Sequence, residues 1–317
     1  MASLGAAADC RGLSRADVVW FDLFDPTPEE ERAVEHLLGV AVPTRQEMAE
    51  IEESARLYTE AGALVMTAVV AQGVTEGRPR RAQVTFVLNA GHLVTVRYAD
   101  PLPFRNFAAK CARQPERHRT AAAVLVSLLE TIVERAADVL EGVAAELNEI
   151  AATLFLDDRE RGPAKAETVL RSIVRRLGRK NVTLAILRES LLSLSRLVPF
   201  LRQGAGGFLP DDDAVRLKAI DRDIRSLSAY EAQTEAQITY LHDATLGLIN
   251  LDQNRIIKVF SIAAVLFLPP TLVGTVYGMN FEFMPELNWL FGYPFALLLM
   301  VVSALIPLWW FKRRGWL

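Results

Sequence analysis

The stretches Val259–Phe281 (VFSIAAVLFLPPTLVGTVYGMNF) and Leu287–Phe311 (LNWLFGYPFALLLMVVSALIPLWWF) decide the architecture of this chain. They are 23 and 25 residues long and contain no charged side chain. A helix needs about 20 apolar residues to cross the hydrocarbon core of a bilayer. The sequence therefore predicts two transmembrane helices, preceded by a long segment rich in Glu, Arg and Ala that has the composition of a soluble protein.

The overall composition limits the class of protein. A length of 317 residues favours about two domains, and a net charge of −3 argues against a nucleic-acid partner. Cys10 and Cys111 are too few for a disulfide framework, and the N-terminus has no apolar signal segment. We therefore expect the soluble part to lie in the reducing cytosol.

The basic residues around the apolar runs predict an orientation. Arg255 and Lys258 flank the start of the first run, and Lys312–Arg314 follow the second. The loop between the runs contains Glu282 and Glu286 but no Lys or Arg. By the positive-inside rule, both termini are cytoplasmic in a multi-pass protein of the cell (inner) membrane, and the loop faces outward.

The N-terminal part has the pattern of a mixed α/β domain. Residues 16–26 predict a strand, and Thr27 and Thr44 are predicted helix N-caps, each followed three residues later by Glu. Residues 57–72 and 83–98 are rich in β-branched and aromatic residues and predict strands, with a hairpin turn at Asn89–His92.

Long helices follow. Ala121–Phe155 and residues 164–202 predict an antiparallel helical hairpin, and no proline lies between Pro210 and Pro269, which permits one continuous helix. The expected division is a cytosolic α/β domain (1–118), a helical hairpin (119–210), a stalk helix (211–258), a first transmembrane helix (259–279), an extracytoplasmic loop (280–288), a second transmembrane helix (289–311) and a basic cytosolic tail (312–317).

The predicted stalk helix carries a heptad seam with a polar middle layer. Its members are Leu217, Ile220, Ile224, Leu227, Glu231, Thr234, Ile238, Leu241, Thr245 and Leu248. A lone helix of this length could not bury such a seam. We therefore expect it to pack around a symmetry axis with copies of itself.

The same helical face continues into the first apolar run. It carries Asn254, Ile257, Ser261, Ala264, Leu268, Thr271 and Thr275, with Phe260 adjacent. In a bundle this face would line a pore with polar ends and an apolar constriction. Ordinary packing between membrane helices is the alternative. Pro269-Pro270 favours the pore because it frees backbone carbonyls, and the second run has few polar residues and is expected to face lipid.

A short motif lies between the two runs. Gly278 and Asn280 both tolerate φ > 0, which predicts a turn. The motif and its surroundings comprise Tyr277-Gly278-Met279-Asn280, Met284-Pro285-Glu286-Leu287, Gly292-Tyr293-Pro294, Lys312-Arg313-Arg314 and Trp316-Leu317. In this arrangement the sequence resembles the CorA family of divalent-cation transporters. The resemblance extends to Trp20–Leu23 with Pro26-Thr27, and to Val94–Arg97, which are similar to two strands of that family.

This resemblance implies a funnel-shaped homopentamer with an αβα cytosolic domain, long stalk helices and a pore lined by the first membrane helix. It implies that Asn280 is the outer-mouth ligand for hydrated Mg²⁺, supported by Tyr277, Gly278 and Met279. The other implied roles are a hydroxyl ring at Thr271, a polar ring at Asn254, a hydrophobic gate at Ile257, Phe260 and Leu268, and a cytosolic basic ring at Lys312, Arg313 and Arg314.

The ion chemistry agrees with these roles. Mg²⁺ gives up its waters reluctantly and prefers oxygen ligands, so neutral amide oxygens can bind its hydration shell without stripping it. Glu282 and Glu286 can concentrate cations at the mouth. The resemblance also implies regulatory acidic residues; because Ala219 occupies the aligned position, we take Asp221 and Asp223 as candidate sensor ligands.

Two alternatives stay open. A branch resembling the ZntB-type proteins transports Zn²⁺, and Co²⁺ or Ni²⁺ are further candidate ions, but His36, His92, His118 and His242 have no ligand-like spacing. From another class, a membrane-anchored cytosolic enzyme or sensor would need a catalytic constellation. The sequence has no such motif, so we expect no enzymatic activity and no organic cofactor.

Overall fold

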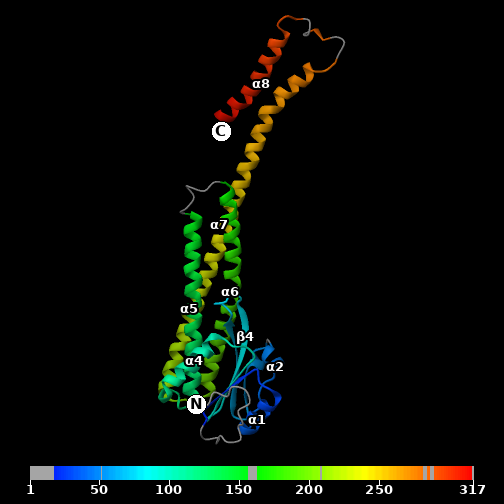
Figure 1. Ribbon diagram of the computed structural model, residues 1–317. Helices are drawn as coiled ribbons and strands as arrows, with labels where there is room; N and C mark the ends of the chain where they lie inside the picture. The colour runs from blue at the N-terminus through cyan, green and yellow to red at the C-terminus, as the bar shows by residue number, and fades with distance from the viewer. Residues whose placement is uncertain are drawn as a thin grey trace. The chain divides into compact units, whose positions relative to one another are not determined.

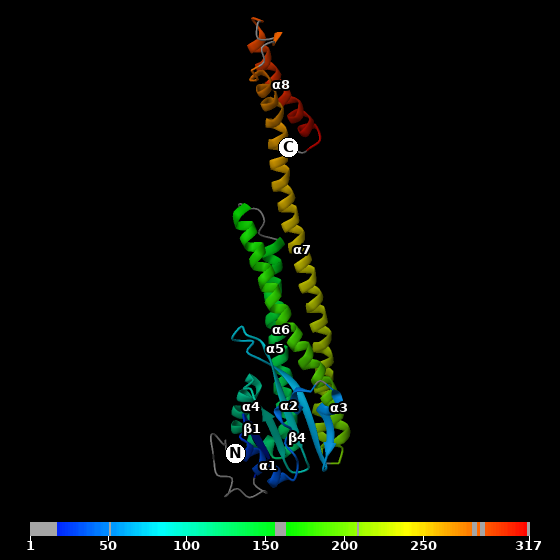
Figure 2. The ribbon, with the colours of Figure 1, turned by 90° about the vertical axis from the view of Figure 1, so that its right-hand side faces the viewer.

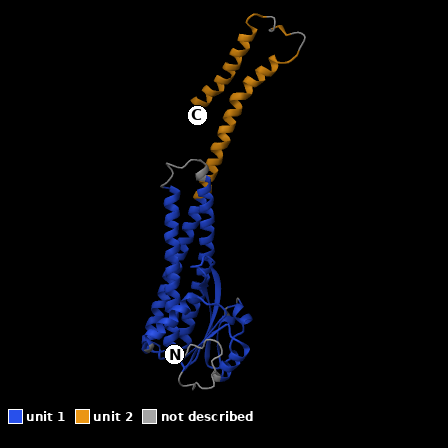
Figure 3. Ribbon diagram, in the orientation of Figure 1, with its two compact units in different colours: residues 1–243 blue, residues 244–317 orange. Residues whose placement is uncertain are grey.

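The computed structural model describes residues 18–50, 52–155, 163–207, 209–280, 284–285 and 289–315. The chain divides into two compact units, residues 1–243 and residues 244–317 (Figure 3). The long helix α7 (Asp211–Tyr277) contributes residues to both units. Each unit is described below by itself.

A five-stranded mixed sheet forms the centre of the first unit. Its strands are β1 (Trp20–Phe24), β2 (Leu57–Glu60), β3 (Ala63–Gln72), β4 (Arg80–Leu88) and β5 (Leu93–Arg97), in the order β1-β5-β4-β3-β2. β1 pairs with β5 in parallel, and the other neighbours are antiparallel. The predicted strands and the turn at 89–92 are confirmed. The run 57–72 is divided into two strands, because Ala61 and Gly62 adopt positive φ values of 47° and 79° in a tight turn.

The described part of the first unit contains both short and long helices. They are α1 (Pro28–Leu38), α2 (Arg45–Ala49), α3 (Glu53–Arg56), α4 (Leu102–Arg113), the 3-10 helix η2 (Pro115–His118), α5 (Ala121–Phe155), α6 (Pro163–Gly204) and the first part of α7. Thr27 is the N-cap of α1 and Thr44 forms a capping box, as predicted, and Thr27 also forms a capping box with Glu30. In that box, the Thr27 amide donates to Glu30 Oε2 at 2.8 Å.

Helices cover both faces of the sheet, which confirms the αβα arrangement (Figure 1). On one face, Phe21, Val65 and Val94 form a buried cluster with Val34 of α1 and Met48 of α2. On the other face, the long helices pack on the sheet, and the Val69 amide donates to Ser193 Oγ of α6 at 3.0 Å. At Gly204, α6 approaches β3 so closely that a Cβ would lie 2.5 Å from Leu64 Cδ2.

The heptad seam of α7 is buried within a single chain, which corrects the prediction that copies of the chain cover it. α5, α6 and the first part of α7 lie side by side (Figures 1 and 2). Leu217 and Ile224 are 0% exposed and Leu241 is 1% exposed. The prediction was wrong because it treated α7 alone, whereas the helical hairpin offers an apolar surface of comparable length. The seam therefore gives no argument for self-association.

Ion pairs reinforce this three-helix packing. Arg216 of α7 donates to both carboxylate oxygens of Glu130 on α5, at 2.9 and 2.6 Å. In the polar layer of the seam, Arg188 of α6 donates to Glu231 at 3.2 Å and also to Glu235. These hydrogen bonds raise the pKa of Arg188 above its usual value, and the bond from Arg188 lowers the pKa of Glu235.

The second unit contains the two apolar helices. The last part of α7 and α8 (Gly292–Arg313) each include a window with a mean hydropathy of 2.1, long enough to cross a membrane. α8 runs back beside α7 within this unit (Figure 3). A Cβ at Gly274 of α7 would lie 3.1 Å from Met300 Cε of α8, so a small residue permits this close approach.

Candidate functional site

The α7 segment of the second unit has two distinct sides. The side facing α8 carries half-buried residues, including Ile262, Leu266, Val273 and Gly274. At about 100° per residue, the predicted pore face lies roughly opposite. Its members are exposed in the single chain: Asn254, Ile257, Phe260, Ser261, Ala264, Leu268, Thr271 and Thr275.

The apolar members of this face are exposed in the single chain. Phe260 and Leu268 are each 71% exposed, and Ile257 is 61% exposed. α8 has few polar residues and packs against the other side of α7, so it leaves this mixed face uncovered. α7 therefore has one side that packs near α8 and another that is exposed in the single chain.

The two threonines of this face present oxygen lone pairs. Thr271 Oγ1 donates to the Phe267 carbonyl at 2.7 Å, and Thr275 Oγ1 donates to the Thr271 carbonyl at 2.8 Å. Because each hydroxyl proton is used within the helix, the oxygen can act as an acceptor toward the outside. Such an oxygen suits the water molecules around a hydrated cation, which donate hydrogen bonds.

α7 passes through Pro269 and Pro270 without a break. Neither proline has an N–H, so the carbonyls of Val265 and Leu266 lose their helical donors. This agrees with the prediction that the proline pair frees backbone carbonyls in the apolar segment.

The motif Tyr277-Gly278-Met279-Asn280 lies at the end of α7. Tyr277 is the last helical residue, the Gly278 amide donates to the Gly274 carbonyl at 3.0 Å, and the Met279 amide donates to the Val276 carbonyl at 3.3 Å. Asn280 follows and is exposed. Glu282 and Glu286 lie outside the described residues.

Gly278 lies in the predicted turn but does not adopt a positive φ, because the chain leaves the helix through further capping hydrogen bonds and not through a left-handed residue. A residue without a side chain still suits this position, because a Cβ at Gly278 would lie only 3.0 Å from the Gly274 carbonyl oxygen.

The chain is similar to proteins of a known family. The sequence matches the family described as CorA-like Mg²⁺ transporter protein over residues 15–313. This chain belongs to the CorA-like family. Among its relatives, the magnesium transport protein CorA of Sodalis glossinidius is 35% identical over 303 residues, which cover 95% of this chain and 92% of that protein. The protein of the same name from Salmonella typhimurium is 34% identical, with coverage of 96% and 93%.

Solved structures share the fold. The complete CorA magnesium transporter of Methanocaldococcus jannaschii has a TM-score of 0.73 at 21% identity and covers 94% of this chain and 91% of its own. The full-length CmaX protein has a TM-score of 0.68 at 19% identity, with coverage of 97% and 90%. These likenesses confirm the CorA-like arrangement of an α/β domain, long helices and two C-terminal apolar helices.

The candidate sensor residues of this CorA-like chain lie apart from the α7 pore face. Asp221 is mostly buried and accepts a hydrogen bond from Arg225 at 2.8 Å, whereas Asp223 is exposed. Within the described ranges, no group of three or more His, Cys, Asp or Glu side chains is placed to hold a metal ion.

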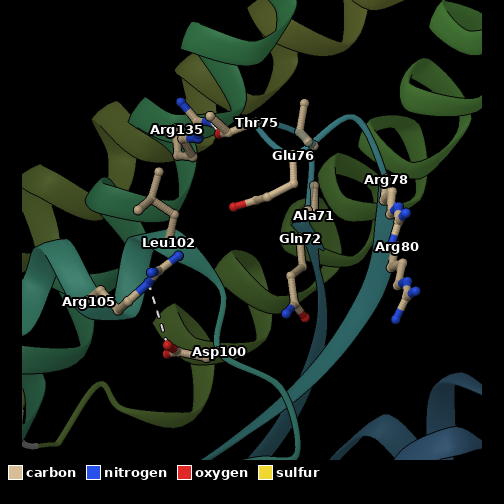
Figure 4. A pocket seen from close by; sticks show the side chains of 12 residues that line it. Ala71, Gln72, Thr75, Glu76, Arg78, Arg80, Asp100, Leu102, Arg105 and Arg135 are labelled. Carbon is tan, nitrogen blue, oxygen red and sulfur yellow. Dashed lines mark hydrogen bonds and ion pairs between the residues drawn. The ribbon is translucent and has the colours of Figure 1, made fainter.

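A cavity of about 200 Å³ lies in the first unit, between β3, β4, α4 and α5 (Figure 4). Arg135 donates to Thr75 Oγ1 at 2.8 Å on one side, and Arg105 lies 3.5 Å from Asp100 on another. Charges of both signs line it, and no residue predicted for the ion path does. No pattern in the sequence indicates this cavity, because its walls come from four separate elements.

The buried thiol gives no support to the enzyme alternative. Cys111 of α4 is 3% exposed, and burial raises its pKa to about 11. A thiol must ionise to act as a nucleophile, so Cys111 is inert at neutral pH.

Proposed function

We propose that this protein transports Mg²⁺ across the cell membrane as a homopentameric, channel-like complex whose pore is lined by α7. The observation that carries the proposal is the exposed face of α7, which lies opposite α8 and leads to Asn280. Membership of the CorA-like family supports it, because the relatives are named magnesium transport proteins. One helix cannot enclose a pore, so the exposed face needs several copies around an axis.

Ion selection takes place at the outer mouth in this proposal. A ring of Asn280 amide oxygens accepts hydrogen bonds from the hydration shell of Mg²⁺, an ion that loses water reluctantly. Thr275 and Thr271 continue the path with hydroxyl oxygens, and Asn254 forms the polar ring at the cytosolic end. Glu282 and Glu286 raise the local cation concentration outside the ring.

Ile257, Phe260 and Leu268 form the gate. A ring of apolar side chains excludes water when it is narrow, and this blocks a hydrated ion without any charged group. We expect Leu268→Asn to wet the constriction and to raise the Mg²⁺ influx rate several-fold in proteoliposomes. Leu268→Met is the matched control, because it keeps an apolar side chain of similar volume. Equal rates in the two variants would contradict the gate.

By the positive-inside rule, the basic residues that flank the apolar runs are cytoplasmic. Both termini then lie in the cytoplasm, and the Gly278–Asn280 motif lies outside. Asp221 and Asp223 then lie on the cytosolic side, where a divalent cation could bridge neighbouring subunits. We expect Asp221→Asn with Asp223→Asn to weaken the inhibition of uptake by internal Mg²⁺. The measurement is uptake by proteoliposomes preloaded with increasing Mg²⁺, and an unchanged inhibition curve would overturn the sensor assignment.

Zn²⁺ is the alternative cargo, with Co²⁺ and Ni²⁺ as further candidates. Zn²⁺ prefers nitrogen and sulfur ligands, whereas the proposed path presents amide and hydroxyl oxygens. The test of the function is uptake by protein-containing and protein-free liposomes with Mg²⁺ and Zn²⁺ in competition. We expect protein-dependent Mg²⁺ uptake, and exclusive Zn²⁺ uptake would favour the alternative.

A further inference from the structure

The end of α8 combines arginine and tryptophan in two pairs. Arg313 Cζ lies 5.3 Å from the ring centroid of Trp309, and Arg314 Cζ lies 5.4 Å from the ring centroid of Trp310. Each arginine follows its tryptophan by four residues, so the two side chains meet on the helix surface. At these distances each guanidinium is attracted to the face of an indole ring.

The packing of α8 determines which way the first pair faces. Gly292, Ala296 and Phe311 are the buried residues of α8, and they mark the side that packs within the second unit. Trp309 and Arg313 each lie two residues from Phe311, which is about 200° around the helix. The Trp309–Arg313 pair is therefore on the outer side of α8, where Trp309 is 60% exposed.

The sequence around the two arginines carries no acidic side chain. The sequence from 287 to 317 contains no Asp or Glu, and among the described residues no ion pair joins Arg313 or Arg314 to a carboxylate. The apolar run ends at Phe311, so the pairs lie at the level where hydrocarbon gives way to headgroups.

We propose that Arg313, held against Trp309 on the outer side of α8, binds the phosphate of an anionic phospholipid headgroup, and that the exposed Arg314 at the same helix end adds a second positive charge. The guanidinium fork matches phosphate oxygens in a bidentate way, and the indole rings keep the fork at the interface. Anionic lipids of the cytoplasmic leaflet supply the ligand. The inference rests on the membrane placement of α8 in the proposed function but not on the transported ion.

The test uses the full-length protein in detergent micelles with added phosphatidylglycerol or phosphatidylcholine. We expect phosphatidylglycerol to raise the thermal unfolding temperature of the wild type at low lipid concentration. Loss of about fivefold in affinity for each arginine predicts that Arg313→Gln with Arg314→Gln needs about 25-fold more phosphatidylglycerol for the same shift. Arg222→Gln is the control, because Arg222 is an exposed arginine of the first unit.

A second variant tests the role of the indole rings. Trp309→Leu keeps both charges and an apolar surface but removes the ring beneath Arg313, and we expect a smaller loss of affinity. Glycerol phosphate serves as a free-phosphate probe and is expected to give no shift. Equal stabilisation of wild type and double variant, or equal effects of the two lipids, would overturn the proposal. The assay does not measure ion flux, so its failure is separate from failure of the transport function.

Discussion

Asn280→Ala is expected to lower Mg²⁺ influx in proteoliposomes by at least about 100-fold. In the proposed ring every copy loses the amide that binds the hydration shell, and each lost hydrogen bond contributes roughly 1 kcal/mol. Because the losses act together on one ion, three or more of them add up to about 3 kcal/mol, which exceeds a factor of 100 in binding. The measurement is the initial rate reported by a Mg²⁺-sensitive dye trapped inside the vesicles.

A second variant tests whether position 280 needs a neutral amide or only a polar side chain. Asn280→Asp keeps the size of the side chain but replaces a neutral oxygen by a charged one, which should bind Mg²⁺ more tightly and release it more slowly. Asn148→Ala is the control, because Asn148 lies on α5 and makes a 3.3 Å hydrogen bond to Gln237. Normal flux in Asn280→Ala, with normal protein yield, would sink the assigned role of Asn280.

Arg188→Met is expected to destabilise the three-helix packing by about 3 kcal/mol. Glu231 is 4% exposed, and among the described residues its Oε1 has no hydrogen-bond partner, although it lies 3.0 Å from Arg188 Nη2. Removing Arg188 leaves the Glu231 carboxylate buried and unpaired. Breaking a buried ion pair in this way costs about 3–5 kcal/mol. The lower end applies because the Arg188 side chain is 47% exposed and water can replace part of the interaction.

The measurement is the thermal unfolding temperature of the purified protein. Arg171→Met is the matched control, because the Arg171–Glu167 pair is 72% and 59% exposed and such surface pairs contribute about 0–1 kcal/mol. Arg188→Met combined with Glu231→Leu should recover most of the loss, since no unpaired charge then remains. An equal shift in the Arg188 and Arg171 variants would contradict the account of the buried layer.

Local signals made much of the fold predictable. Thr27 is the expected N-cap and Thr44 forms the expected capping box, because capping depends on residues close together in the sequence. The apolar runs became α8 and the end of α7 because their length and hydropathy are properties of the sequence itself. Long-range packing was less predictable: the α7 seam looked like a self-association surface until the helical hairpin was seen to cover it.

The candidate site was also predictable only in part. Spacing alone placed Leu268, Thr271 and Thr275 on one face of α7, and their exposure opposite α8 agrees with that pattern. The conformation of Gly278 was not predictable from residue type, because glycine is compatible with both left-handed and helical backbone. The Arg188–Glu231 pair joins residues 43 positions apart, so only the packing of α6 on α7 could reveal it.

The most direct test of the central claim is selective block of the ion path by a thiol reagent. Thr275 lies on the exposed face of α7, whereas Val273 lies on the half-buried side near α8. In a chain with Cys10 and Cys111 replaced by Ser, Thr275→Cys and Val273→Cys are each treated in proteoliposomes with a bulky cationic methanethiosulfonate. The account predicts that Mg²⁺ influx stops in Thr275→Cys and continues in Val273→Cys. Block in Val273→Cys alone, with Thr275→Cys unaffected, would contradict a path along this face of α7.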